Sequence, residues 1–161
     1  MVFARTEAVA AYPTITSEGR GPLIGWIGWA ALSGLAADPV DAGKVYAVSD
    51  LVLSAAPTIY TIDTTQTPTK ITAALTVTRG KDAAQKLELE GIAADGAGGF
   101  WLASAGRSDR LVPHAIYHVD AKGKIDQEIA LPEVLLDQEV RFGFGGITLV
   151  GDTLWLAVQR E

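Results

Sequence analysis

The sequence contains no cysteine and comparatively few basic residues. Its 161 residues include 13 Lys and Arg against 19 Asp and Glu, a formal net charge of −6 with a pI near 4.9. The absence of cysteine excludes disulfides and thiolate metal sites, and it leaves the redox compartment undecided. Binding to a nucleic-acid backbone depends on clustered Lys and Arg. The acidic balance therefore argues against a nucleic-acid partner.

Targeting and membrane signals are also weak. Residues Met1–Ala11 lack the basic start and apolar centre of a signal peptide. The uncharged stretch Gly21–Ala37 has 17 residues, four of them glycine, and is shorter than the ~20 apolar residues that a spanning helix needs. We therefore expect buried strand there and no membrane span. The alternation at Thr14–Thr16 predicts one further short strand.

What the sequence does contain is a repeat built around glycine. Its clearest copy has a short strand, Gly91–Ala94, then a turn of Asp and Gly residues, then a second strand, Phe100–Ser104. Glycine accepts positive φ and Asp bonds its own backbone, as a hairpin turn requires. The unit recurs around Gly34 and Gly146, which stand 57 and 55 residues from Gly91. A period of several short strands near ~50 residues is typical of a β-propeller.

Two of the repeats continue into third and fourth strands. The predicted third strands, Thr58–Asp63 and Ala115–Asp120, alternate in the same way and match almost residue for residue. The predicted fourth strands are Lys70–Val77 and Lys124–Pro132. Four antiparallel strands make one propeller blade. The last repeat, which begins at Phe142, has only two predicted strands.

We therefore predict one all-β domain over residues 1–161, a propeller-like array of four-stranded blades. It would hold about two and a half blades, with repeats at about 23–80, 81–135 and 136–161. A closed propeller needs at least four blades, and an open array leaves strand edges unpaired. The sequence thus predicts a fragment or processed half, completed by the remaining half of the propeller or by a second copy.

Three pairs of motifs resemble the family described as esterase-like activity of phytase, and the similarity runs from Leu23 to the C-terminus. They are Leu32–Leu35 with Val45–Asp50, Leu89–Ala93 with Gly99–Ser104, and Phe142–Ile147 with Leu154–Ala157. The resemblance covers the first half of the family domain. It implies a bacterial protein with a phytase-like propeller and a periplasmic or secreted location.

The resemblance also implies an activity, a calcium-assisted hydrolase acting on a phosphorylated small molecule. The chain keeps an acidic residue, Glu90, ahead of a repeat glycine, but it has Ala105 and Gly145 where the family pattern carries Glu. These neutral positions favour an alternative, a non-catalytic extracytoplasmic binding scaffold. Whether the protein is an enzyme stays open, and the isolated 161 residues are expected to be inactive.

The candidate site residues are charged groups near strand ends. Glu88 and Glu90 would share one face of a strand, and their hard oxygens suit calcium, which would hold the phosphate oxygens of a substrate. Asp50 ends the second strand of the first repeat and is a third candidate metal ligand. Arg107 offers a bidentate fork for phosphate. We assign catalysis to Glu90 and Arg107; the structural alternatives are a solvated edge, a backbone bond or a turn.

Two further groups carry less weight. His114 and His118 would share one face of a strand with Asp109 nearby, yet no zinc-ligand motif is present. Ser104 lacks both a Gly-x-Ser-x-Gly elbow and an obvious local base. The sequence therefore predicts neither a histidine metal site nor a serine nucleophile.

Overall fold

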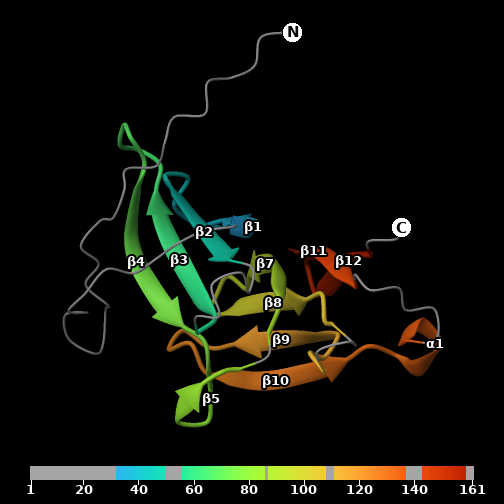
Figure 1. Ribbon diagram of the computed structural model, residues 1–161. Helices are drawn as coiled ribbons and strands as arrows, with labels where there is room; N and C mark the ends of the chain where they lie inside the picture. Colours follow the sequence, from blue (N-terminus) through green and yellow to red (C-terminus); the bar gives the residue numbers. More distant parts are fainter. Residues whose placement is uncertain (1–31, 50–55, 86, 108–110, 137–142, 159–161) are drawn as a thin grey trace, which may run out of the picture.

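The computed structural model describes residues 32–49, 56–85, 87–107, 111–136 and 143–158, which form antiparallel sheets (Figure 1). The first sheet, blade 1, has four strands that pair in chain order: β1 (Leu32–Ala37), β2 (Lys44–Ser49), β3 (Thr58–Asp63) and β4 (Lys70–Thr76). The second sheet, blade 2, repeats this plan with β7 (Leu89–Ala94), β8 (Phe100–Ser104), β9 (Ala115–Val119) and β10 (Ile125–Ala130). The prediction of an all-β array of four-stranded blades is confirmed.

A third sheet holds the beginning of another repeat. The strands β11 (Phe144–Val150) and β12 (Thr153–Val158) form an antiparallel hairpin, which we call the blade 3 hairpin. The strand expected at Thr14–Thr16 lies outside the described residues, as does residue 31 and everything before it. The last residues of the uncharged stretch Gly21–Ala37 form β1, as expected for strand rather than a membrane helix.

The three inner hairpins share one irregularity of register. Pairing slips by one residue between Leu32 and Gly34, between Leu89 and Gly91, and between Phe144 and Gly146. A bulge of this kind places an extra residue in one strand and bends that strand locally. The extra residues are Ser33, Glu90 and Gly145, each directly before a repeat glycine. We call the end of the hairpins that carries them the bulge end, and the opposite end, where the two strands connect, the turn end.

The repeat glycines have a packing reason. A Cβ added at Gly34 would lie 2.9 Å from Cα of Gly91, and one added at Gly91 would lie 3.0 Å from Cα of Gly146. Atoms that close would force the backbones apart, so the innermost strands approach each other only where no side chain intervenes. Figure 1 shows β1, β7 and β11 gathered at the middle of the structure. The regular spacing of the repeat glycines in the sequence therefore marks the points where neighbouring blades touch.

Apolar cores fill the spaces between the blades. The core between blades 1 and 2 includes Val48, Ile59, Leu102 and Tyr117. The core between blade 2 and the blade 3 hairpin includes Ala103, Ile116, Phe144, Leu154 and Leu156. Neighbouring residues of β8, Leu102 and Ala103, therefore face opposite blades, because side chains alternate along a strand. Blade 2 is packed on both faces.

Two small elements were not anticipated from the sequence. A two-stranded hairpin, β5 (Thr78–Arg79) with β6 (Asp82–Ala83), connects the first two blades, and one helical turn, α1 (Glu133–Leu136), follows β10. The connecting hairpin is fixed to blade 2, because Thr78 N–H donates to the Gly123 carbonyl at 2.7 Å and Arg79 pairs with Glu128 at 2.7 Å. Within the described ranges, no helix is long and apolar enough to cross a membrane.

Candidate functional site

The bulge end brings two of the predicted site residues to the same part of blade 2. The Glu88 carbonyl accepts a hydrogen bond from Ala105 N–H at 2.8 Å, and Glu88 N–H donates to Ser104 Oγ at 3.2 Å. Arg107 follows Ala105 by two residues. Glu88 and Arg107 therefore flank the same end of the β7–β8 hairpin, and Glu90 occupies the bulge beside them.

Glu90 is half-buried in a position with clear equivalents in the other blades. In blade 1 the bulge residue is Ser33, whose hydroxyl donates to the Leu89 carbonyl of blade 2, and in the blade 3 hairpin it is Gly145. The register slip at Glu90 interrupts the strict alternation on which a shared face for Glu88 and Glu90 was predicted. Their joint action on one ligand stays a prediction.

Arg107 lies at the base of a tight loop. Its backbone forms two hydrogen bonds with Val112, at 2.9 and 3.0 Å, and the loop contains Leu111 with a positive φ of 55°. The N–H and the carbonyl of Arg107 are both bonded to Val112, which fixes the position of the Arg107 backbone. The side chain is half-buried and remains in contact with solvent. Such a rooted arginine suits recognition of a phosphate or carboxylate.

The predicted metal ligands are only partly visible in the described structure. Asp50 lies outside the described residues; its neighbour Ser49 ends β2 opposite Leu32, which is the bulge end of blade 1. Among the described residues, no group of three or more His, Cys, Asp or Glu side chains is arranged to hold a metal ion. Calcium takes six to eight oxygen ligands. Glu88 and Glu90 supply the right donor atoms, and a calcium site here stays a prediction.

Ser104 is positioned as a structural residue. Its side chain is fully buried, its hydroxyl donates to the Pro113 carbonyl at 3.2 Å, and it accepts from Glu88 N–H. A nucleophile must reach the substrate with a base at hand. A hydroxyl held between two backbone groups and closed off from solvent instead stabilises the bulge end.

The two histidines serve different ends of blade 2. His114 is almost fully buried, and a Cβ added at either Gly106 or Gly143 would lie 2.4 Å from its ring. His118 lies four residues further along the chain, so at 3.3 Å per residue its Cα is about 13 Å from that of His114. The two rings have different neighbours at opposite ends of the strand, and the structure does not bring them together.

His118 instead joins the turn end of blade 2 to its outer strand. Its Nε2 lies 3.1 Å from Asp95 Oδ2, its Nδ1 lies 2.6 Å from Asp126 Oδ1, and the ring of Trp101 packs against it. Burial lowers the pKa of His118, but the hydrogen bonds to Asp126 and Asp95 outweigh burial and raise it above its ordinary value. Burial acts to raise the pKa of Asp95, and the bonds from Ala97 N–H and His118 overcome this and lower it.

Blade 1 has an equivalent acidic residue at its turn end. Asp38 stands four residues after Gly34, as Asp95 stands four after Gly91, and its Oδ1 accepts from Val40 N–H and Asp41 N–H at 2.9 and 2.8 Å. The hydroxyl of Tyr46 donates to the other oxygen. That hydrogen bond is the main reason why the pKa of Asp38 falls to about 2. The pKa of Tyr46 rises to about 12, mainly because the hydroxyl is partly buried and also because of its hydrogen bond to Asp38 and the negative charge there.

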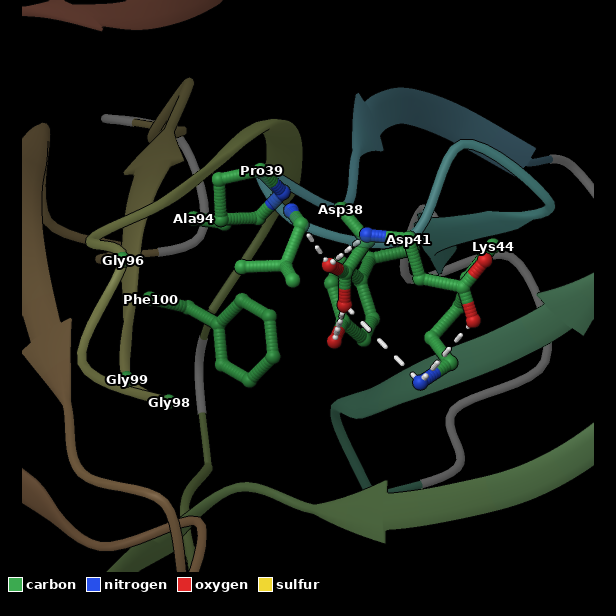
Figure 2. Close-up of a pocket in the computed structure, with 11 residues that line it drawn as sticks. Asp38, Pro39, Asp41, Lys44, Ala94, Gly96, Gly98, Gly99 and Phe100 are labelled. Carbon is green, nitrogen blue, oxygen red and sulfur yellow. Dashed lines mark hydrogen bonds and ion pairs between the residues drawn. The ribbon is translucent and has the colours of Figure 1, made fainter.

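A cavity of about 280 Å³ lies between these two turns (Figure 2). Asp38, Asp41 and Lys44 line the blade 1 side, and Phe100 and three glycines line the blade 2 side. The Lys44 ammonium lies 3.9 Å from Asp38 and 3.8 Å from Asp41. The ring of Tyr46 meets Phe100 edge to face, with centroids 4.7 Å apart. The cavity is at the turn end, away from Glu88, Glu90 and Arg107 at the bulge end, and only the recurrence of Asp38 and Asp95 in the sequence points to it.

Two four-stranded antiparallel sheets and a third hairpin, joined along glycine-bearing inner strands, define a partial β-propeller. Residues 27–161 match the Phytase-like family, described as esterase-like activity of phytase. The chain belongs to this family, which confirms the resemblance seen in its motifs. Neither a curated protein nor a solved structure matches the chain significantly.

Proposed function

We propose that this chain carries part of the active site of a phytase-like hydrolase that cleaves a phosphate ester of a small molecule. Membership of the Phytase-like family is the observation that carries the proposal. Support comes from the bulge end of blade 2, where the backbones of Glu88, Glu90 and Arg107 lie at the same end of the β7–β8 hairpin.

The roles follow from the chemistry of these side chains. Arg107 binds the phosphate group through its planar fork of N–H donors. Glu90 accepts a proton from the water that attacks phosphorus, the ester P–O bond breaks, and the departing alcohol oxygen takes a proton from solvent; a half-buried carboxylate at a strand bulge can act as this general base. Glu88, Glu90 and Asp50 are the groups that would hold calcium, with other oxygens completing its shell. Bound calcium would supply positive charge toward the phosphate oxygens.

Thermal unfolding with calcium tests the metal part of this proposal. Calcium binds only the folded state, so it should raise Tm, and Glu90→Gln should abolish the rise. Glu128→Gln is the matched control, because Glu128 pairs with Arg79 on the outer strand and should leave the calcium response unchanged. A wild-type chain with no response to calcium would contradict a calcium site.

Release of inorganic phosphate from inositol hexakisphosphate tests the activity. Glu90→Gln should lower kcat, and Arg107→Lys should mainly raise KM, because Lys keeps the charge but loses the fork. Residues 1–161 alone are expected to be inactive, so the assay is also run on a closed propeller that contains them. A completed propeller with no phosphate release would contradict the hydrolase.

A second candidate function is a non-catalytic binding scaffold. The neutral residues Ala105 and Gly145, at positions where the family pattern carries Glu, favour it, and the cavity at the turn end offers a place for a ligand. Under this alternative, a phosphorylated ligand binds without turnover and Glu90→Gln leaves its affinity unchanged. For either function the family resemblance supports a periplasmic or secreted location, which cell fractionation tests.

A further inference from the structure

The cavity between the turn ends of blades 1 and 2 has preformed walls. Oδ1 of Asp38 accepts two backbone N–H groups of the blade 1 turn, and Oδ1 of Asp95 accepts two of the blade 2 turn, at 2.7 and 2.8 Å. Each turn is therefore fixed by its own aspartate. The volume of about 280 Å³ is slightly below the ~300–1,000 Å³ that is typical of sites for drug-sized molecules, so the cavity suits a smaller one.

The charged groups of the cavity leave it negative. The carboxylates of Asp38 and Asp41 face one ammonium group, that of Lys44, so the described lining residues have a net charge of one negative unit. A pKa lowered to about 2 keeps Asp38 ionised at neutral pH, and a pKa raised to about 12 keeps Tyr46 neutral. The Lys44 ammonium lies 3.9 and 3.8 Å from the two carboxylates, beyond hydrogen-bond distance. Both carboxylates can therefore accept a closer cation.

The rest of the cavity lining is mainly apolar. Val40 is 90% exposed on the blade 1 turn, and Phe100 lines the opposite, blade 2 side (Figure 2). Gly96 and Gly98 have positive φ values of 79° and 96°, and they complete the blade 2 side without side chains. Apolar surface beside carboxylates matches a molecule that combines one cationic group with an apolar body.

The same groups argue against two other classes of ligand. Calcium takes six to eight oxygen ligands, whereas no three His, Cys, Asp or Glu side chains in the described ranges are arranged around a common metal position. The negative charge repels a phosphorylated molecule, so under either proposed function the phosphate belongs at the bulge end with Arg107. An ammonium group needs only one or two carboxylates for its charge-assisted hydrogen bonds.

We propose that the turn-end cavity is a binding site for a small primary amine with an apolar body, separate from the phosphate chemistry of the bulge end. Oδ1 of Asp41 accepts from Gly43 N–H at 2.9 Å, so its Oδ2 receives the ligand's ammonium group, which takes the place of Lys44. The apolar body lies between Val40 and Phe100. This binding function does not depend on the hydrolase.

Binding of 2-phenylethylamine to the 161-residue chain tests the proposal, with 2-phenylethanol as the uncharged probe of matched shape. We expect saturable changes of the backbone amide NMR shifts, confined to residues 38–44 and 95–100 of the two turns. The alcohol should bind about tenfold more weakly or not at all, because it lacks the charge that the carboxylates recognise. Added salt should weaken binding of the amine, because it screens that attraction.

Substitutions on the two sides of the charge balance should have opposite effects. Asp41→Asn keeps the oxygen that accepts Gly43 N–H but removes the charge, and it should weaken binding of the amine about tenfold. Lys44→Met keeps the apolar stem but removes the competing ammonium group, and it should tighten binding about threefold or more. Asp152→Asn, in the turn of the blade 3 hairpin, removes a distant negative charge and should leave the affinity unchanged. Asp38 is left intact because it holds its turn.

Three results would overturn the proposal. The first is the absence of saturable shifts at the two turns. The second is equal affinity for the amine and the alcohol, which would mean that the cavity recognises only apolar surface. The third is weaker binding after Lys44→Met, which would mean that Lys44 holds the ligand. The probe contains no phosphate, so each of these results leaves the hydrolase to its own test.

Discussion

At the scale of single residues, glycine decides how close the blades come. Gly91 and Gly146 occupy equivalent positions but have different surroundings. A Cβ at Gly91 would lie 2.9 Å from the Ile147 backbone nitrogen, whereas a Cβ at Gly146 would meet only the Ala157 Cβ, at 3.7 Å. Substitution by alanine should therefore destabilise the fold at Gly91 and have little effect at Gly146.

We expect Gly91→Ala to lower the free energy of unfolding by about 1–3 kcal/mol, because the new methyl group forces two backbones apart. Gly146→Ala should stay within about 0.5 kcal/mol of wild type, since ordinary contact replaces open space. Urea unfolding of both variants measures the difference. Equal effects of the two substitutions would argue against contact between the innermost strands at Gly91.

His118 should make stability depend on pH. Because its pKa is raised in the folded state, its protonated form stabilises the fold fully below the unfolded value of about 6.5, and this contribution is lost as the pH rises through the folded value. The difference in unfolding free energy between wild type and His118→Gln should be about 1–2 kcal/mol at acidic pH and shrink at alkaline pH.

Unfolding of both proteins in urea between pH 5.5 and pH 9 measures this effect; in the control Asp126→Asn, loss of the negative charge beside Nδ1 should make the pH dependence smaller. A difference that grows with rising pH would contradict the assignment.

At the scale of elements, the connecting hairpin β5–β6 is held by burial more than by charge. The ion pair between Arg79 and Glu128 is half-exposed, with 49% and 38% of the two side chains accessible. Val77 and Leu87, which flank the hairpin, are almost completely buried in the core between blades 1 and 2. Exposed ion pairs contribute little, because solvent screens them.

We therefore expect Val77→Ala to cost about 2 kcal/mol and Arg79→Ala less than about 1 kcal/mol. Urea unfolding gives both values, and limited proteolysis of the connection reports its local opening. A larger effect of Arg79→Ala than of Val77→Ala would mean that charge rather than packing holds this connection.

The elements also show what the sequence could and could not predict. The hairpins around Gly34, Gly91 and Gly146 were predictable because alternation, turn residues and a constant period all agree. The start predicted for the first strand of the clearest hairpin, Gly91, is too late: β7 begins at Leu89, because pairing resumes beyond the bulge that Glu90 creates. The hairpin β5–β6 was missed because its two-residue strands depend on contacts with Gly123, which is distant in the sequence.

For the site, the sequence could predict residue types but not their neighbours. Glu88, Glu90 and Arg107 are candidate site residues from the sequence, and in the structure their backbones lie at one end of the β7–β8 hairpin. The sequence did not predict the role of His118, because Asp95 and Asp126 reach that ring from a turn and from an outer strand. Such meetings depend on the register between strands, which no local pattern encodes.

At the scale of the whole molecule, the described residues form two four-stranded blades and one hairpin, whose face away from blade 2 exposes Trp155 and Val150. On blade 1, the residues Ala47 and Tyr60 of the opposite face are already buried, so that face offers little apolar surface to a second copy. A closed symmetric dimer requires a self-complementary surface. The net charge of −6 further opposes association of like chains.

We therefore expect light scattering after size exclusion to give the mass of one chain, 16.9 kDa, at low protein concentration. Trp155→Lys should leave this mass unchanged and reduce aggregation at high concentration, because it charges the open face. A sharp dimer would show that two copies complete one ring and would shift functional assays to that assembly.

The bulge separates two tasks within the inner hairpins. Gly34 and Gly91 let the innermost strands of neighbouring blades touch, and the residue just before each repeat glycine differs from hairpin to hairpin: Ser33, Glu90 and Gly145. Close packing and candidate chemistry therefore lie at adjacent but separate positions. A substitution at Glu90 can change the chemistry of the bulge end while Gly91 keeps its contact with the blade 3 hairpin.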